Sequence, residues 1–175
     1  LAPASAYSAG KAQATLNRNW SDMTPMYFTG VGKKVHILTI DGLGLNRLLV
    51  SEGLGSDDPL TVNPMRGDTK NNPALRGKAN MSLSEQIEFV SGSVAQLDYK
   101  RVETSAPKPV TVSGVKGVRF EVTAVTPEGL NIKGLAQAVS KDGLSYYIVY
   151  LAPAEHYYDT SLANAVAVLD SVKLP

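Results

Sequence analysis

Three strand-like segments separated by tight turns lie between Val118 and Ala152, and they restrict the fold more than any other feature of the sequence. The first segment begins at Val118, and the second and third are Leu130–Ser140 and Leu144–Ala152. The turns between them are Pro127-Glu128-Gly129 and Lys141-Asp142-Gly143. In the first segment, apolar residues occupy every second position: Val118, Phe120, Val122 and Ala124. Two-residue periodicity interrupted by turn residues predicts a three-stranded antiparallel meander.

The segments before the meander predict a hairpin and a helix. Val35–Gly42 and Leu45–Leu54 are β-rich, and Asp41-Gly42-Leu43-Gly44 between them favours a tight turn. Ser82 and Glu85 form the Ser-x-x-Glu pattern of a capping box. The apolar residues that follow have helical spacing, so they are expected to form the packed face of a helix: Leu83, Ile87, Val90, Val94 and Leu97.

The remaining segments complete an α+β pattern. Residues 99–104 predict a strand, and Pro109–Gly117 predicts an edge strand or a bulged connection. After Pro153 a helix is expected, capped by Thr160 or Ser161, with an apolar face made of Leu162, Ala165, Val166, Leu169 and Val172. The predicted fold class is α+β, an antiparallel sheet (hairpin plus three-stranded meander) covered by helices.

The domain organisation follows from these segments. Residues 26–175 are expected to form a single α+β domain, and residues 1–25 a flexible or spacer segment with a short helix at Ala9–Leu16 and Trp20 as its one large anchor. Gly55–Asn80 has turn chemistry without periodicity, which predicts a long loop. Loops of this length are usually functional or mobile, and both readings stay open.

Composition excludes several classes of function. A net charge of +1 with scattered basic residues argues against a nucleic-acid partner. The absence of cysteine excludes thiol catalysis, disulfides and cysteine-ligated metals. The longest apolar stretches, such as Ile148–Ala154, are far shorter than the roughly 20 residues of a membrane-spanning helix.

The beginning of the chain suggests a compartment. It starts at Leu1 and continues with small, polar, Ala- and Ser-rich residues, as mature exported proteins and the spacers of lipoproteins often do. We therefore expect an exported protein, periplasmic or held to the membrane by a lipid anchor upstream of Leu1; a truncated start is the alternative.

Two stretches of the sequence carry a resemblance. The first is TIDGLGLNRLLVSEGL (residues 39–54). The second runs from SLSEQIEFV (82–90) through VSGVKGVRFEV (112–122) and YIVYLAPAEHYYD (147–159) to LDSVKL (169–174). Both resemble the PsbP/Mog1-like fold family, which includes small exported bacterial proteins and lipoproteins. The resemblance implies a helix-covered α/β/α sandwich and a largely non-enzymatic role as an accessory or binding protein. It carries no shared catalytic motif, so no residue role is transferred.

Candidate catalytic and metal residues are few. Ser113 and Lys116 match Ser-x-x-Lys, but in a predicted strand turn instead of a helix, and Asp57, Asp58 and Asp68 lack the spacing of a calcium loop. The run Glu155 to Asp159 around His156 offers one imidazole and two carboxylates, yet acidic residues also favour a helix N-terminus for structural reasons. We predict no catalytic residue, no metal and no cofactor.

The tyrosines are the last candidates. Tyr146 and Tyr150 share one face of their strand and Tyr147 the other, so they predict either an aromatic contact surface or a half-buried band beneath the last helix. The candidate binding residues are Tyr147, His156, Tyr157, Tyr158 and Arg66.

The sequence thus favours a non-catalytic binding or accessory protein of the cell envelope that contacts an unidentified protein or small ligand. The alternative is a small hydrolase or metal-assisted enzyme centred on His156.

Overall fold

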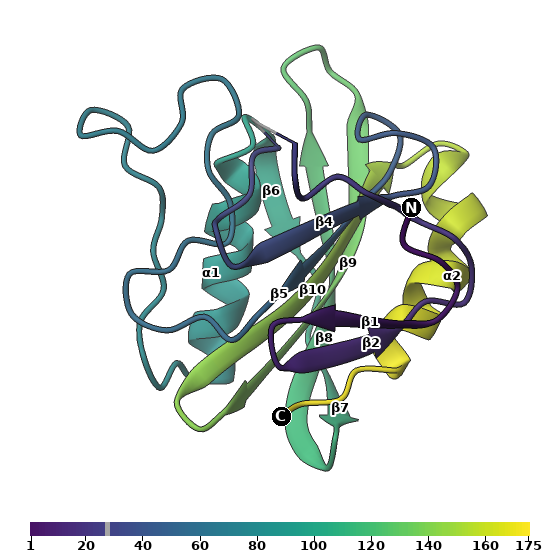
Figure 1. Cartoon of the computed structure of the whole chain (residues 1–175). Coiled ribbons are helices and arrows are strands. Elements are labelled where there is room, and N and C mark those ends of the chain that lie inside the picture. Colours follow the sequence, from purple (N-terminus) through teal and green to yellow (C-terminus); the bar gives the residue numbers. More distant parts are fainter. Residues whose placement is uncertain (27–28) are drawn as a thin grey trace.

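An antiparallel sheet runs through the middle of the computed structural model, which describes residues 1–26 and 29–175, and a helix covers each face of that sheet (Figure 1). The strands of the main sheet are β3 (Ser21–Asp22), β4 (Val35–Thr39), β5 (Arg47–Ser51), β6 (Lys100–Thr104), β7 (Lys108–Val112), β8 (Val115–Val125), β9 (Asn131–Lys141) and β10 (Leu144–Pro153). Within the described residues their order is β3-β4-β5-β10-β9-β8-β6, and β7 also pairs with β8. The α+β class is confirmed.

The meander is confirmed as β8, β9 and β10. Leu144 pairs with Lys141, so only Asp142 and Gly143 lie in the turn, both with positive φ (53° and 81°). Positive φ at both central positions is the backbone that matches the twist of a two-residue hairpin. The predicted hairpin β4–β5 also forms, although residues 40–46 connect its strands in place of the expected tight turn at residues 41–44. Strand β5 then pairs with β10 from the other end of the chain.

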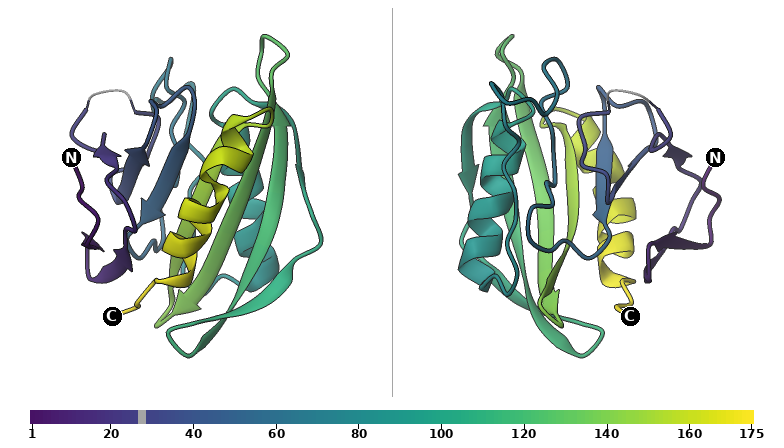
Figure 2. Two further views of the ribbon diagram at one scale, coloured as in Figure 1. Left: turned by 90° about the vertical axis from the view of Figure 1, so that its right-hand side faces the viewer. Right: turned by 60° about the vertical axis from the view of Figure 1, so that its left-hand side comes forward.

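The two largest apolar cores lie on opposite faces of the sheet. Successive residues of β10 alternate between them, so Tyr147, Val149 and Leu151 belong to one core and Ile148, Tyr150 and Ala152 to the other. Figure 2 shows the two helices on opposite sides of the strands. Since both faces are covered, β10 is buried from Ser145 to Pro153.

Helix α1 (Leu83–Ala95) begins with the predicted capping box, because the Glu85 amide donates to Ser82 Oγ and the Ser82 amide to Glu85 Oε1, each at 3.1 Å. Its packed face is wider than predicted. Leu83 and Ile87 are only half-buried, while the residues that are buried on the helix are Gln86, Phe89, Val90, Ser93 and Val94. The Thr61 hydroxyl donates to the Ser93 carbonyl at 2.6 Å, so the long loop covers α1 in addition to the sheet.

Helix α2 (Tyr157–Asp170) begins about one turn earlier than predicted. Thr160 and Ser161 lie inside the helix, and the N-cap position is His156, with φ 69° and no side-chain cap. Tyr158 is buried and stacks on Tyr150 with 5.4 Å between ring centroids. This packing holds the extra turn on the sheet, an effect that local capping residues do not encode.

The N-terminal segment corrects two sequence expectations. Instead of a helix at Ala9–Leu16, β1 (Ala6–Ala9) and β2 (Ala12–Thr15) form a hairpin, with Gly10 at φ 60° in its turn. The segment is also not a free spacer, because Leu16 and Trp20 are buried in the core on the α2 side and Gln13 exchanges two backbone hydrogen bonds with Lys173. Within the described residues, neither helix is long and apolar enough to cross a membrane.

Candidate functional site

The predicted binding tyrosines do not form one surface. Tyr147 is buried on the α1 side, 5.5 Å between ring centroids from Phe89, and burial raises its pKa to about 12. Tyr158 is buried on the α2 side, where burial likewise raises its pKa to about 12. The sheet separates the two rings, and both act as core residues.

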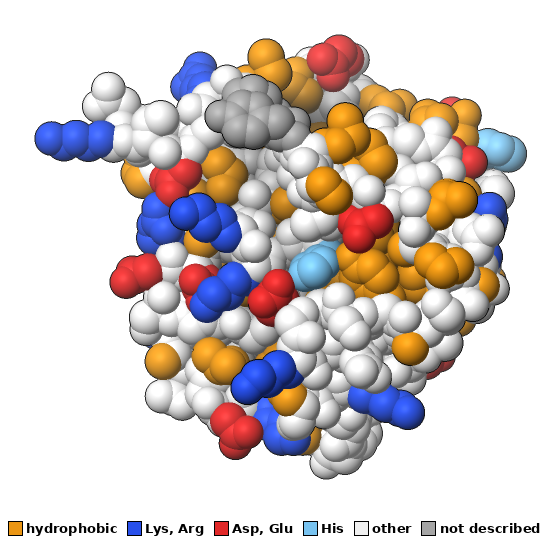
Figure 3. Space-filling model, in the orientation of Figure 1, with side chains coloured by type: hydrophobic (Ala, Val, Ile, Leu, Met, Phe, Trp, Pro, Cys, Tyr) orange, Lys and Arg blue, Asp and Glu red, His pale blue; other side chains and the backbone are white. Residues whose placement is uncertain are grey.

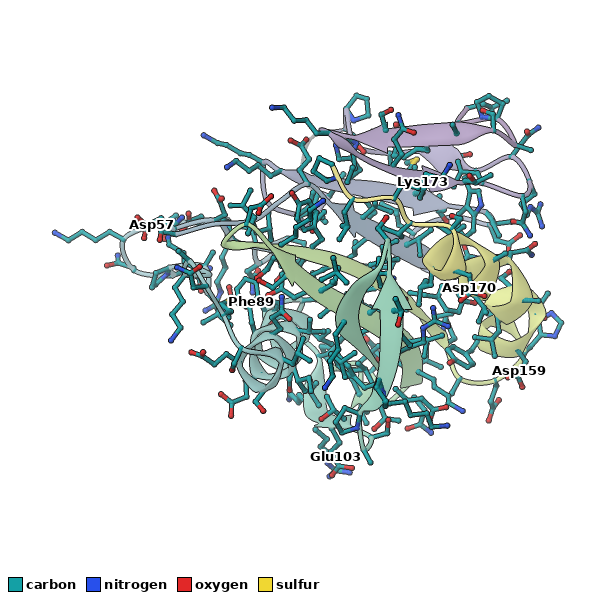
Figure 4. The ribbon with its side chains drawn as sticks, turned by 90° about the horizontal axis from the view of Figure 1, so that it is seen from below. Asp57, Phe89, Glu103, Asp159, Asp170 and Lys173 are labelled. Atoms are coloured by element: carbon teal, nitrogen blue, oxygen red, sulfur yellow. The ribbon has the colours of Figure 1, made fainter. Side chains whose placement is uncertain are left out.

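The other predicted residues lie far apart. His156 is exposed at the start of α2, with its ring edge-on to Tyr157 at 5.1 Å between centroids, whereas Arg66 is exposed in the long loop. Figure 4 shows Asp57 of that loop and Asp159 of α2 at opposite sides of the molecule. No three His, Asp or Glu side chains converge on a common point in the part of the chain that the structure describes.

A groove of about 440 Å³ lies between the segment entering β4 and the long loop. Residues 30–32 pair with 60–62, through hydrogen bonds from the Gly32 amide to the Leu60 carbonyl (3.1 Å) and from the Val62 amide to the Gly30 carbonyl (3.0 Å). The loop also pairs with itself, since the Gly77 amide donates to the Asp58 carbonyl at 2.9 Å. The lining residues are Val31, Gly32, Lys33, Lys34, Asp57, Asp58, Pro59, Val62, Asp68 and Arg76.

Ion pairs organise the charges of this groove. Lys34 Nζ lies 3.0 Å from Asp58 Oδ2, and Arg76 pairs with Asp68 while donating to the Asp57 carbonyl at 2.9 Å. Partial burial raises the pKa of Asp58, but the Gly55 amide and the Lys34 ammonium outweigh burial and lower it overall. Figure 3 shows acidic and basic side chains gathered over this loop, at the left of the view. The groove therefore presents both signs of charge on a backbone that is already fixed.

Gly32 allows the loop to approach β4 closely, and replacing it by Ala is expected to disturb the groove. A Cβ at this position would lie 2.1 Å from the Pro59 carbonyl oxygen, which is main chain and cannot rotate away. We expect Gly32→Ala to lower the free energy of unfolding by about 3 kcal/mol in a urea titration, the upper part of the range for overpacking. Gly44→Ala, with nothing within 4 Å of its Cβ, is the matched control. Equal stability of the two variants would contradict the close approach.

A chain of polar side chains links the N-terminal hairpin to the sheet. Tyr7 Oη lies 2.9 Å from both Asp22 Oδ2 and His36 Nδ1, and His36 Nε2 lies 3.0 Å from Glu52 Oε2. Burial and the hydrogen bond to Asp22 raise the pKa of Tyr7 well above its ordinary value. Burial acts to raise the pKa of Asp22, but hydrogen bonds from Thr24 and Tyr7 and the charge of His36 lower it overall. The four side chains come from four separate segments of the chain.

Comparisons with solved structures identify the fold. The structure aligns with cyanobacterial PsbP (CyanoP) from Synechocystis sp. PCC 6803 with a TM-score of 0.61 and 14% identity, covering 100% of this chain and 94% of that one. It aligns with the Saccharomyces cerevisiae Ran-binding protein Mog1p with a TM-score of 0.52 and 12% identity, covering 94% and 90%. The fold is of the PsbP/Mog1 type. No protein-family model matches the sequence, and no curated protein matches it by sequence.

On this PsbP/Mog1-like scaffold, sequence reasoning missed both polar features. His36 falls within the predicted strand Val35–Gly42, yet its hydrogen-bond partners Tyr7 and Glu52 lie 29 positions earlier and 16 positions later in the chain, so nothing local marks the cluster. The groove had a partial signal, because the turn residues of Gly55–Asn80 predict the long loop that forms one side of it. Its anchoring to residues 30–32 was not visible, since isolated backbone pairs have no side-chain signature.

Proposed function

We propose that this protein is a non-catalytic accessory or binding protein that contacts a protein partner through the groove between the β4 entry and the long loop. The observation that carries this proposal is the groove itself: a hollow of about 440 Å³ with three basic and three acidic lining residues, fixed by backbone pairs and ion pairs. A surface that is ordered before binding loses less conformational entropy on association than a mobile loop would.

Two further features support a protein partner. Met65, on the same loop, is 84% exposed, and exposed methionines are adaptable apolar contacts at binding surfaces. One of the solved structures with this fold is a Ran-binding protein, so the scaffold is compatible with protein recognition. The mixed charges favour a partner surface that also carries both signs, because complementary charges steer association and fix its register.

A site-specific cross-linking experiment tests this proposal. The chain has no cysteine, so Met65→Cys creates a unique attachment point for a photoreactive maleimide on the long loop, between the groove-lining residues Val62 and Asp68. Leu130→Cys, 47% exposed in the turn between β8 and β9, is the matched control. In an extract of the source organism, we expect one discrete adduct from the variant at position 65 and none from that at 130. Excess unlabelled wild type should suppress the adduct, and Lys33→Glu should suppress it less.

The same experiment can refute the proposal. Equal labelling from both positions would indicate non-specific contact, and competition by Lys33→Glu as strong as by wild type would remove the groove from the interface. Labelling only from position 130 would move the contact surface to the turn between β8 and β9.

We also propose that the protein works in the cell envelope, as a periplasmic protein or a lipid-anchored one. The support is the resemblance of two stretches of sequence to exported PsbP/Mog1-like proteins, together with the shared fold. Fractionation of the source cells with an antibody against this chain tests the compartment. Recovery in the periplasmic or membrane fraction is expected, and recovery in the cytosol with a cytosolic marker would contradict it.

A further inference from the structure

The hydrogen bonds around His36 require a definite number of protons. Three short contacts run in series, Asp22–Tyr7, Tyr7–His36 and His36–Glu52, and each needs one hydrogen between its two heavy atoms. The Tyr7 hydroxyl supplies one hydrogen, and the two carboxylates, when ionised, supply none. A neutral imidazole supplies one more, and an imidazolium supplies two.

Only the imidazolium form of His36 supplies enough hydrogens for all three hydrogen bonds. If neutral His36 donates to Glu52, Nδ1 takes the hydroxyl hydrogen of Tyr7, and two oxygens then face each other at 2.9 Å between Tyr7 and Asp22. If it donates to Tyr7 instead, the lone pair of Nε2 faces the Glu52 carboxylate at 3.0 Å. With both nitrogens protonated, His36 donates to Glu52 and to Tyr7, and Tyr7 donates to Asp22.

Two carboxylates face His36. They are the Asp22 carboxylate from β3 and the Glu52 carboxylate that follows β5, with the Tyr7 hydroxyl from β1 between the ring and Asp22. The nearby basic side chain of Lys34 directs its ammonium to Asp58 at 3.0 Å. The His36 side chain is 20% exposed and that of Glu52 34%, so protons exchange with solvent without unfolding.

These four hydrogen-bonded side chains join the N-terminal hairpin to the sheet. Tyr7 lies on β1, and a Cβ on Gly10 of the hairpin turn would lie 2.9 Å from Glu52 Oε1, so the turn rests against the Glu52 side chain. Beneath the hairpin is a narrow apolar cavity of about 20 Å³, lined in part by Ala12, Val139 and Tyr146. Loosening the hairpin would open this cavity.

We propose that His36, Tyr7, Asp22 and Glu52 form a proton-dependent latch that holds the β1–β2 hairpin on the sheet when His36 is an imidazolium and loosens it when His36 is neutral. Because only the imidazolium form completes the three hydrogen bonds, the hold is complete where His36 is protonated, at acidic pH, and is lost where His36 is neutral, at alkaline pH. This inference is independent of the proposed binding groove.

Hydrogen exchange of the intact chain, read by peptide mass spectrometry and corrected for the intrinsic pH dependence of exchange, tests the latch. Between about pH 5 and about pH 8, the range in which histidine changes charge, protection of residues 1–12 should fall at least about tenfold. Protection of residues 144–152 in β10 should stay constant over the same range. Equal protection of residues 1–12 at both ends of the range would overturn the proposal.

Glu52→Gln is the decisive variant. A glutamine amide can donate to Nε2 of neutral His36, which then donates through Nδ1 to Tyr7, so the chain is complete without the second proton. We expect this variant to keep the hairpin protected at both pH values, whereas Glu128→Gln, in the turn between β8 and β9, should behave as wild type. If Glu52→Gln retains the full pH dependence, the latch does not exist as described.

Discussion

Replacing Trp20 by Ala is expected to lower the free energy of unfolding by about 3–5 kcal/mol, the range for deleting a fully buried large aromatic side chain. Trp20 is 0% exposed and belongs to the core on the α2 side with Leu38 and Leu48. The backbone of Trp20 also exchanges two hydrogen bonds with Ala2, at 2.7 and 2.9 Å. Because the buried side chain holds this backbone in place, removing the side chain should loosen the start of the chain too.

A urea titration followed by circular dichroism measures this effect, with Leu130→Ala as the control at an exposed turn. The control should change stability by no more than about 0.5 kcal/mol. A loss below about 1 kcal/mol for Trp20→Ala would mean that residues 1–25 are not packed on the sheet, in line with the flexible or spacer segment expected from the sequence.

The second large effect is expected at Phe89, and it discriminates between the predicted and the observed face of α1. Phe89 is 4% exposed and packs against Tyr147, so Phe89→Ala should cost about 3–5 kcal/mol. Ile87, which helical spacing places on the predicted packed face, is only half-buried, and Ile87→Ala should cost about 1–2 kcal/mol.

The same titration in parallel for both variants decides between the two faces. The slope of free energy against urea should match the wild type in both, which would show that the unfolded states expose the same surface. A larger loss from Ile87→Ala than from Phe89→Ala would restore the face predicted from spacing alone.

The proposed latch and the anchoring of the groove were beyond sequence reasoning for one physical reason. Each depends on side chains or backbone groups that meet only after distant strands have paired. Tyr7 reaches His36 because β1 folds over the sheet, and Gly32 reaches Pro59 because residues 30–32 pair with 60–62. Neither contact leaves a periodic or motif-like trace in the chain.

The tyrosines of β10 show the same limit of sequence reasoning. Alternation in β10 correctly separates Tyr147 from Tyr150, because consecutive side chains of a strand point to opposite faces. Alternation does not say whether a face is covered. Only the placement of α1 and α2 on opposite faces made both residues core, with Tyr150 Oη donating to the Tyr158 carbonyl at 2.9 Å.

The sequence by itself determined the local elements: the meander and its turns, the β4–β5 hairpin, the capping box of α1 and the α+β class. These depend on interactions between residues close in the chain, where period-two alternation, Gly and Asp at positive φ and a reciprocal cap act locally. Tertiary structure decided the rest: the pairing of β5 with β10, the packed face of α1, the early start of α2 and the docking of the N-terminal hairpin. Those features depend on which apolar surface is left to cover once the sheet has formed, and burial of that surface outweighs local capping and helix preferences.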